Sequence, residues 1–277
     1  MAADIERWNA AGLQYSVEDS VAWLRMNRPE RRNAIHIPLR TALLQAIHEV
    51  SEDPDVRAAV ITGNGVAFSS GADLAQEGGA GELPKERWRS IETARRDDSM
   101  LYAWNRLMNA IWNSDKVFIS AVNGIAAGGG CQLALACDFI VASEEASFWE
   151  VFVHRGFPLE GGGAWILPKL TSLVRAKEIA ILGEPLTAAE ALQFGMINRC
   201  VSADALESTA RDIAARVAKG PTIRIGHIKS QLNASYEQTK DQSFRDEANY
   251  MGLHGGSDAT EAITAYIERR PPNFTGR

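Results

Sequence analysis

AVNGIAAGGGCQLALACD, residues 121–138, is the stretch from which the rest of the fold can be worked out. An apolar start is followed by the turn-forming pair Asn123-Gly124, and then by the glycines Gly128–Gly130 and an apolar run to Cys137. This order predicts a strand, a tight turn and a helix with a glycine-rich beginning. Because glycine has no Cβ atom and tolerates positive φ, such a turn lets the backbone approach another group closely.

A second glycine turn occurs earlier in the chain. AFSSGAD, Ala67 to Asp73, follows the apolar strand-like run VRAAVITG, Val56 to Gly63. The first N–H groups of a helix have no partner inside it, and the helix dipole adds partial positive charge there. Two backbone donors from separate turns, aimed at one carbonyl oxygen, would form an oxyanion hole. The alternative is a pair of turns that serve close packing only.

Composition and charge restrict the class of protein. The chain has 277 residues, 45% hydrophobic and 23% charged, which is ordinary for a globular protein with one large domain or two small ones. A net charge of −6 and a pI of about 5.5 do not suggest a nucleic-acid partner. Charged residues interrupt the region where a signal peptide would be apolar, and no run reaches the ~20 apolar residues of a membrane span, so we expect a cytoplasmic protein.

The remaining pattern is that of an α/β protein. Alternation predicts a hairpin over residues 13–25, apolar spacing predicts a helix over 39–50, and a buried strand follows at 56–62. Gly78–Pro84 and Lys85–Asp98 are expected to be mobile. Further helices are expected at 104–111, 167–183, 205–218, 223–234, 246–252 and 260–269, and short strands at 117–122 and 198–201. A capping box is expected at Thr187 and Glu190.

No metal-ligand spacing is apparent, and Cys131 and Cys137 are expected to be reduced core thiols.

Three stretches together carry a family resemblance: AFSSGADL, AVNGIAAGGGCQLALACD and the closing ATEAITAYIERRPPNFTGR. In this order and at these separations they resemble the crotonase (enoyl-CoA hydratase/isomerase) superfamily, from about Val17 to Arg277. The resemblance implies an α/β spiral of ββα units with the site in residues 1–200, and a helical C-terminal oligomerisation region in residues 201–277. It also implies an acyl-CoA substrate, coenzyme A as part of that substrate rather than as a separate cofactor, and a homotrimer or hexamer.

The resemblance assigns roles to particular positions. Backbone N–H groups of Ala72 and Gly129 would polarise the thioester carbonyl, and the segment RPERRNAI, Arg28 to Ile35, would help to hold the nucleotide part of coenzyme A through Arg31 and Arg32. Surface arginines without a ligand are the alternative for these two residues. The full set of implied substrate-binding residues is Arg32, Ala34, Ser70, Gly71, Ala72, Asp73, Leu74, Gly129 and Phe152.

The sequence departs from the hydratase pattern at the two positions where hydratases of this family carry glutamate. Gln132 and Phe152 occupy them, and neither side chain can transfer a proton in general acid-base catalysis. Glu160, in GFPLEGGG, stands where dienoyl-CoA isomerases, 4-chlorobenzoyl-CoA dehalogenase and hydroxyisobutyryl-CoA hydrolases have an acid. Burial in an apolar loop would raise its pKa toward the range of a useful base. The alternative is a structural acid beside the glycine turn.

Other polar residues near this stretch have competing interpretations. His154 is a possible base or a structural histidine, and Glu150 would share a face with Phe152 if the segment were a strand. Asp73 and Asp138 are expected to orient backbone groups. Three functions follow: an enolate-forming isomerase, hydratase or lyase that uses Glu160; a hydrolase or dehalogenase-like enzyme that uses it; or a catalytically silent CoA-binding protein.

Overall fold

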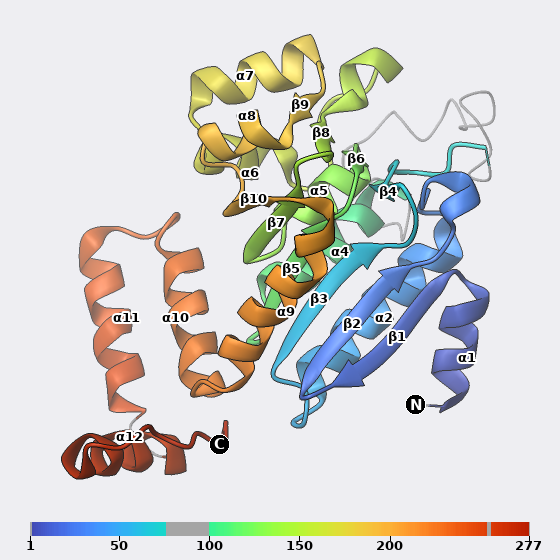
Figure 1. Cartoon of the computed structure of the whole chain (residues 1–277). Helices are drawn as coiled ribbons and strands as arrows, with labels where there is room; N and C mark the ends of the chain where they lie inside the picture. The colour runs from blue at the N-terminus through green and yellow to red at the C-terminus, as the bar shows by residue number, and fades with distance from the viewer. Residues whose placement is uncertain (1, 76–99, 254–255, 277) are drawn as a thin grey trace.

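Two β-sheets form the centre of the molecule (Figure 1). The computed structural model describes residues 2–75, 100–253 and 256–276, so the segments expected to be mobile, Gly78–Pro84 and Lys85–Asp98, lie outside the described residues. The larger sheet has the order β1-β2-β3-β5-β7-β10, with bounds Leu13–Glu18, Val21–Met26, Ala58–Gly63, Val117–Val122, Phe139–Ser143 and Arg199–Val201. The smaller has the order β4-β6-β8-β9, with bounds Ala67–Ser69, Ile125–Ala127, Ser147–Trp149 and Leu186–Thr187.

From β3 to β8, successive strands alternate between the two sheets, and this alternation makes the spiral. β3, β5 and β7 pair in parallel in the larger sheet, and each is followed in the chain by β4, β6 or β8, which pair in parallel in the smaller one. Antiparallel β1 and β2 form the predicted hairpin, with Leu13 opposite Met26. The expected α/β spiral of ββα units is therefore confirmed.

The central strands of the larger sheet are buried on both faces, which explains why β3 and β5 are apolar at nearly every position. Along β3, Ala59 and Ile61 face the core shared with α1 (Ala2–Ala10), α2 (Ile37–Glu52) and α4 (Met100–Trp112). Ala58 and Val60 face α9 (Ala203–Ala218), which covers the opposite face. Figure 1 shows α9 in front of the sheet and α2 behind it.

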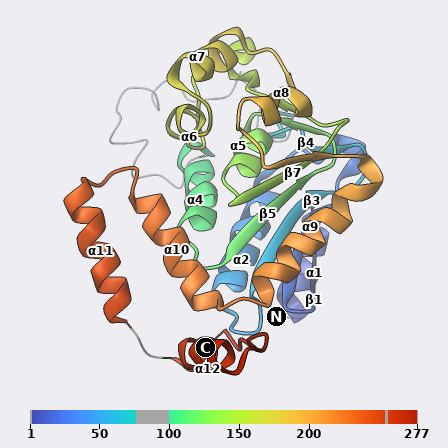
Figure 2. The same cartoon turned by 60° about the vertical axis from the view of Figure 1, so that its left-hand side comes forward.

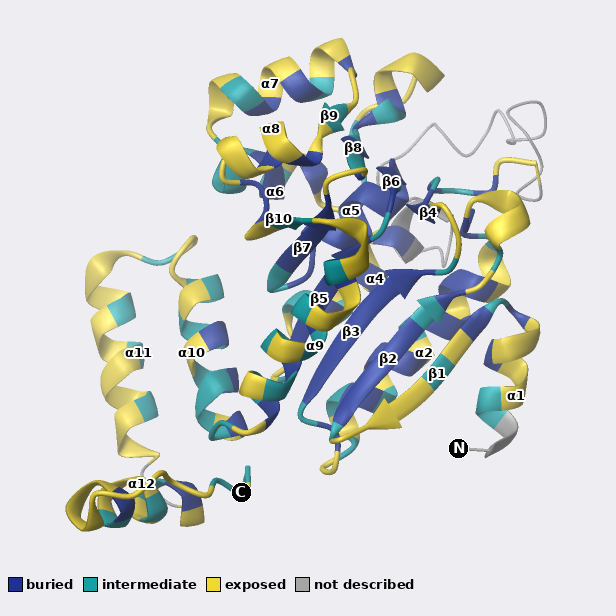
Figure 3. Ribbon diagram, viewed as in Figure 1, coloured by how far each residue is buried: buried dark blue, intermediate teal, exposed yellow. Residues whose placement is uncertain are grey.

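The remaining helices lie at the ends of the sheets. At the end where the smaller sheet lies are α5 (Gly129–Leu135), α6 (Gly163–Leu170), α7 (Leu173–Leu182) and α8 (Ala188–Gln193), together with the 3₁₀ helices η1 (Pro29–Arg31) and η3 (Val151–Arg155). α10 (Thr222–Ala234), α11 (Lys240–Gly252) and α12 (Ser257–Glu268) follow α9. In Figure 2, α10 and α11 stand to the left of the sheets and α12 lies below them. Figure 3 shows that α11 and α12 are largely exposed.

One predicted helix is divided in the structure. The apolar spacing over residues 167–183 predicts a single helix, but α6 ends at Leu170 and α7 begins at Leu173. Ser172 is extended, and its hydroxyl accepts a hydrogen bond from Arg175 N–H, so it is the N-cap of a new helix. The predicted capping box of Thr187 and Glu190 is confirmed at the start of α8.

A buried ion pair joins α10 to the sheet. Lys229 Nζ lies 2.9 Å from Asp138 Oδ2 and also donates to the carbonyl oxygens of Ile111 and Lys116, at 2.8 and 2.9 Å. The same Asp138 oxygen accepts from Phe118 N–H at 2.8 Å. Asp138 thus orients backbone and a lysine, as expected of a structural acid.

We expect Asp138→Asn to lower the free energy of unfolding by about 1.5–3 kcal/mol at pH 8, because the amide keeps an oxygen but removes the charge that Lys229 faces. Denaturant unfolding measures this. The matched control is Asp241→Asn, whose partner Lys240 lies 3.6 Å away on the exposed surface, and which should change stability by less than ~0.5 kcal/mol. Equal stability of the two variants would contradict the proposed contribution of the buried pair.

Candidate active site

The two glycine turns meet at one place. Gly71, between β4 and the short bridge at Ala72, has φ +87°, a conformation that favours glycine. A Cβ atom added there would lie 2.6 Å from the carbonyl oxygen of Ala127 and 3.3 Å from the amide nitrogen of Gly129. The turn after β4 therefore touches the start of α5, although the two are far apart in the sequence.

The backbone bonding around Ala72 determines where its N–H points. Ile35 N–H donates to Gly71 O at 2.7 Å, and Asp73 N–H donates to Ile35 O at 3.1 Å. In this parallel bridge the hydrogen bonds to Ile35 are made by Gly71 and Asp73, the residues on either side of Ala72. The N–H of Ala72 itself therefore points away from Ile35. Within the described part of the chain, neither Ala72 N–H nor Gly129 N–H has a hydrogen-bond acceptor. Two available donors on adjacent turns are what the predicted oxyanion hole requires.

Aromatic side chains flank the Gly128–Gly129 turn. A Cβ atom at Gly129 would lie 2.4 Å from Cη2 of Trp104, so the indole packs directly on this glycine from α4. A Cβ atom at Gly128 would lie 3.3 Å from Cγ1 of Val151 and 3.9 Å from Cζ of Phe152. Trp104 and Phe152 are both buried, and the structure places them beside the turn that carries the Gly129 donor.

The implied coenzyme A segment is fixed to the turn after β4. Ser70 N–H donates to Arg32 O at 2.9 Å, and Ser69 Oγ donates to Asn33 O at 2.8 Å. The Arg28 guanidinium donates to the carbonyl oxygen of Ala34 and lies 3.0 Å from Asp73. This arrangement brings the remaining predicted binding positions together. The exposed ones are Arg31, Arg32 and Leu74, Ser70 is partly exposed, and the buried ones are Ala34, Gly71 and Asp73.

Glu160 begins a turn that packs on the first residues of α5. Gly163 N–H donates to Glu160 O at 3.2 Å, while Gly161 and Gly162 have φ of +62° and +88°. A Cβ atom at Gly161 would lie 3.2 Å from Cβ and Cγ of Gln132, one helical turn beyond Gly129. Glu160 is partly buried. The structure therefore brings the turn that carries Glu160 next to the helix that carries Gly129.

The backbone at Glu150 is not the strand that the sequence suggested. The chain leaves β8 at Trp149 and enters the 3₁₀ helix η3, so the strand alternation that placed Glu150 and Phe152 on one face is wrong. Glu150 is only 1% exposed, and Gln132 Nε2 donates to both of its carboxylate oxygens, at 2.9 and 2.8 Å. Burial raises the pKa of Glu150 to about 7, although hydrogen bonds from Cys131 and Gln132 oppose the rise. Sequence periodicity missed this pair, because the contact joins α5 to the end of β8.

The raised pKa predicts a pH-dependent stability difference. Ionisation of the buried Glu150 carboxyl destabilises the folded state. The contribution of Glu150 to the free energy of unfolding is therefore most favourable below the ordinary glutamate pKa, and it is lost as pH rises through about 7. The stability of Glu150→Gln relative to the original protein should therefore increase by ~3 kcal/mol between pH 4.5 and pH 8. Urea unfolding of both proteins across this range tests the expectation, and a constant difference would contradict it.

Other candidate groups have structural roles. His154 is exposed, and its Nε2 lies 2.9 Å from Gly183 O, so it belongs to the contact between η3 and the end of α7. Cys131 and Cys137 are buried free thiols, as expected, and burial raises the pKa of each. In the described ranges no group of three or more metal-binding side chains gathers, and no helix has the length and hydropathy needed to cross a bilayer.

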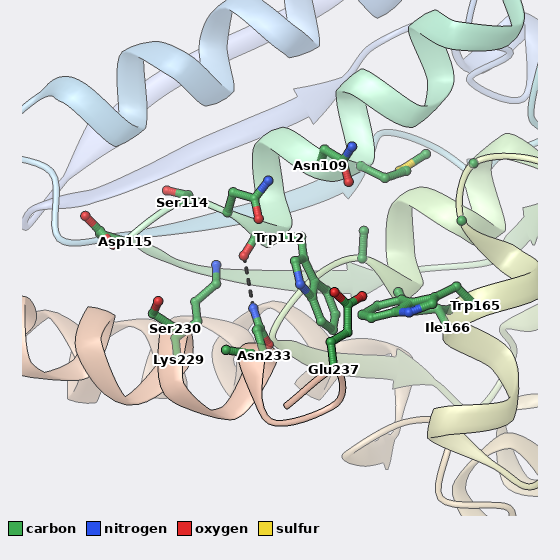
Figure 4. Close-up of a pocket in the computed structure, with 16 residues that line it drawn as sticks. Asn109, Trp112, Ser114, Asp115, Trp165, Ile166, Lys229, Ser230, Asn233 and Glu237 are labelled. Atoms are coloured by element: carbon green, nitrogen blue, oxygen red, sulfur yellow. Dashed lines mark hydrogen bonds between the residues drawn. The ribbon is translucent and has the colours of Figure 1, made fainter. Parts of the chain in front are cut away.

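A cavity of about 500 Å³ lies behind the Glu160 turn (Figure 4). Its wall includes Gly161 and Gly162, together with Met108 and Trp112 of α4 and Trp165 of α6. The Trp112 and Trp165 rings meet edge to face with centroids 4.7 Å apart. At the opposite side are polar groups of α10, where Asn233 Nδ2 donates to Trp112 O at 3.0 Å.

Comparisons with known proteins place the whole chain in one family. A family model described as enoyl-CoA hydratase/isomerase matches residues 16–277. The chain is 34% identical over 266 residues to a probable enoyl-CoA hydratase of Rhodobacter capsulatus, covering 96% of this chain and 98% of that protein. It is 34% identical over 264 residues to a 1,2-epoxyphenylacetyl-CoA isomerase of Escherichia coli, covering 94% and 97%. A crystal structure of a putative enoyl-CoA hydratase from Streptomyces coelicolor superposes with a TM-score of 0.85 at 28% identity, covering 96% of this chain and 94% of that one.

Proposed function

Since the chain belongs to the enoyl-CoA hydratase/isomerase family, we propose that it is an acyl-CoA enzyme that stabilises a thioester enolate and moves a proton with Glu160. The observation that carries the proposal is the meeting of two available N–H donors, from Ala72 and Gly129, beside the turn that contains Glu160. The thioester carbonyl oxygen lies between the two donors. Polarising it makes the α-proton acidic and stabilises the negative charge left when that proton departs.

The acid-base role goes to Glu160 rather than to Glu150. Both oxygens of Glu150 accept hydrogen bonds from the Gln132 amide, so Glu150 lies behind Gln132 and not against the substrate. Gln132 and Phe152 carry no proton that they could exchange at neutral pH. Glu160 is a partly buried carboxylate on the neighbouring turn, and it transfers the proton between carbons of the acyl chain.

This single-carboxylate arrangement favours isomerisation over the addition of water by two glutamates. The similarity to an isomerase that acts on 1,2-epoxyphenylacetyl-CoA supports the same class of reaction and a ring-bearing acyl group. The aromatic walls at Trp104 and Phe152 suit such a group, and the cavity beyond Met108 offers room for the far end of a longer one. Coenzyme A enters only as part of the substrate, along the segment that contains Arg32.

Assembly into a trimer or hexamer is part of the proposal. The helices after α9 expose large apolar side chains, of which Tyr266 is 86% and Ile267 72% exposed on α12, and Phe244 and Met251 are exposed on α11. Exposed apolar surface of this kind favours association with a second copy. The region from residue 201 onward would then be the oligomerisation region, with α9 also covering the sheet. Light scattering after size exclusion measures the mass.

The reaction is tested by a panel of crotonyl-, 3-enoyl-, dienoyl-, hydroxyacyl- and aryl-substituted CoA esters, followed by mass spectrometry and ultraviolet absorbance. A shifted double bond at unchanged mass supports isomerisation. A gain of one water molecule indicates a hydratase, whereas free CoA with a free acid indicates a hydrolase that uses the same Glu160. Binding of the esters without turnover of any of them would overturn the catalytic proposal in favour of a silent CoA-binding protein.

A further inference from the structure

Among the helices that the structure describes, α4, α5 and α10 end at the wall of the cavity behind the Glu160 turn. Their last residues are Trp112, Leu135 and Ala234, and residues at or next to each of these ends line the cavity (Figure 4). The last carbonyl groups of a helix have no partner inside it, and the helix dipole gives that end partial negative charge. α6 begins beside the same cavity and opposes them. On balance, the main chain therefore favours a positive group in this cavity.

The lysine in the cavity wall, Lys229, has no donor left for a ligand. An ammonium group has three N–H donors. Lys229 Nζ donates to Ile111 O at 2.8 Å, to Lys116 O at 2.9 Å and to Asp138 Oδ2 at 2.9 Å. Asp138 also balances the charge of Lys229, so this lysine does not make the cavity positive.

Two carboxylates in the wall are available to a ligand. Asp115 and Glu237 are exposed lining residues, and within the part of the chain that the structure describes neither carboxylate forms a hydrogen bond or an ion pair. Figure 4 shows the Glu237 carboxylate directed toward the side chains of Trp112 and Trp165. The faces of an indole ring carry negative charge, so the carboxylate and the rings together favour a cation between them.

The aromatic wall already binds an ammonium group of this chain. Lys169 Nζ lies 3.4 Å from the centroid of the Trp165 ring and 4.4 Å from that of Tyr236. Neither Lys169 nor Tyr236 lines the cavity, whereas Trp165 does, and its ring meets that of Trp112 edge to face. Glu237 attracts Lys169, but the two form no ion pair. Lys169 thus occupies the aromatic wall from outside the cavity only.

We propose that the cavity binds a small organic cation, an ammonium or quaternary ammonium compound, with its positive group held between Trp112, Trp165 and the Glu237 carboxylate. The volume of about 500 Å³ is within the range of small-molecule pockets. This site is separate from the Ala72 and Gly129 donors, so the inference goes beyond the proposed function and does not depend on it.

The test compares choline with 3,3-dimethylbutan-1-ol, which has the same shape but carries a carbon atom in place of the positive nitrogen. We expect the protein to bind choline at least about tenfold more tightly in a ligand-observed NMR titration at pH 7.5, because the cation gains both the aromatic wall and the carboxylate. Equal affinity for the two compounds, or no binding of choline, would overturn the proposal.

Substitutions in the wall assign the site. Glu237→Gln should lower the affinity for choline by about threefold or more and leave that for the alcohol within about twofold, since only the charge is removed. Glu247→Gln, the same change at an exposed glutamate of α11, is the matched control and should leave both affinities unchanged. Choline affinity that is the same in Glu237→Gln and Glu247→Gln would contradict the assignment.

Two further variants test the aromatic wall. Trp165→Leu should weaken choline binding by about threefold or more, whereas Trp165→Phe, which keeps a ring, should retain most of it. Circular dichroism verifies that both variants fold. Equal choline affinity in the folded Leu and Phe variants would contradict a cation–π contact at this position.

Saturating crotonyl-CoA distinguishes this site from the acyl site. A four-carbon acyl group held at Gly129 is too short to fill the cavity, so the affinity for choline should stay within about twofold when the ester is bound. Displacement of choline by crotonyl-CoA would place the cation in the acyl site and overturn the inference. The ester panel is read without choline, so the proposed reaction and the cation site fail separately.

Discussion

Glu160→Gln should lower kcat on the best ester of the panel by about 10²–10⁴-fold, the usual contribution of a positioned general acid or base. The amide is nearly the same size as the carboxyl group but has no exchangeable acid proton and no basic oxygen at neutral pH. Because the turn at Gly161–Gly163 is held by glycine conformations and by packing on Gln132, the variant should keep its fold and its affinity for the ester. Steady-state kinetics with a direct binding measurement distinguish a loss of kcat from a loss of binding.

The matched control for this experiment is Glu184→Gln, the same change at an exposed glutamate in the loop after α7. Its activity should remain within about twofold of the original protein, since surface substitutions of this kind have small effects. More than a tenth of the original kcat in Glu160→Gln would show that another group moves the proton. Glu150 would then be the next candidate for the base, because its pKa of about 7 suits that role and only its location behind Gln132 argues against it.

Gly129→Ala should reduce kcat/KM by about 10²–10³-fold, the usual cost of losing one oxyanion donor. The added methyl group would lie 2.4–2.8 Å from three atoms of the Trp104 six-membered ring, closer than carbon atoms can approach. Trp104 is only 1% exposed and has little space to move, so the start of α5 must shift and carry the Gly129 N–H with it. Kinetics on the same ester, with circular dichroism to verify folding, measure the effect.

A second-site change tests whether this clash is the cause. In Gly129→Ala combined with Trp104→Leu, the ring is gone and part of the lost activity should return relative to Gly129→Ala alone. Gly252→Ala is the matched control, because a Cβ atom there meets nothing within 4 Å and the residue is not in a left-handed conformation. Gly129→Ala with unchanged kcat/KM would mean that the Gly129 N–H does not contact the reacting carbonyl.

Much of the architecture can be predicted from local sequence because local chemistry decides it. The hairpin of β1 and β2, the glycine turn before α5 and the capping box at Thr187 each depend on residues that are neighbours in the chain. The break between α6 and α7 was missed because the apolar spacing continues across it, and a single serine N-cap outweighs that pattern. Local periodicity also mistook the 3₁₀ helix at Glu150 for a strand.

Local sequence patterns do not predict the parts of the site that depend on contacts between residues far apart in the chain. Glycine positions suggested the two turns, but only the folded chain shows that Gly71 touches Gly129. The hydrogen bonds from Gln132 to Glu150 span 18 residues, and the ion pair from Lys229 to Asp138 spans 91. Neither spacing follows a helical or strand period, so no sequence pattern distinguishes these polar side chains from solvated ones.

In the proposed mechanism the oxyanion donors are main-chain amides, whereas the groups that would distinguish one reaction from another are the side chains at positions 132, 152 and 160. Such a construction would separate the groups that activate the thioester from the groups that move the proton. Mutation could then replace the proton-handling side chains one at a time while the main-chain donors stay in place. The same separation makes this chain a practical scaffold for laboratory evolution, in which libraries at these three positions would explore new reactions on an intact framework.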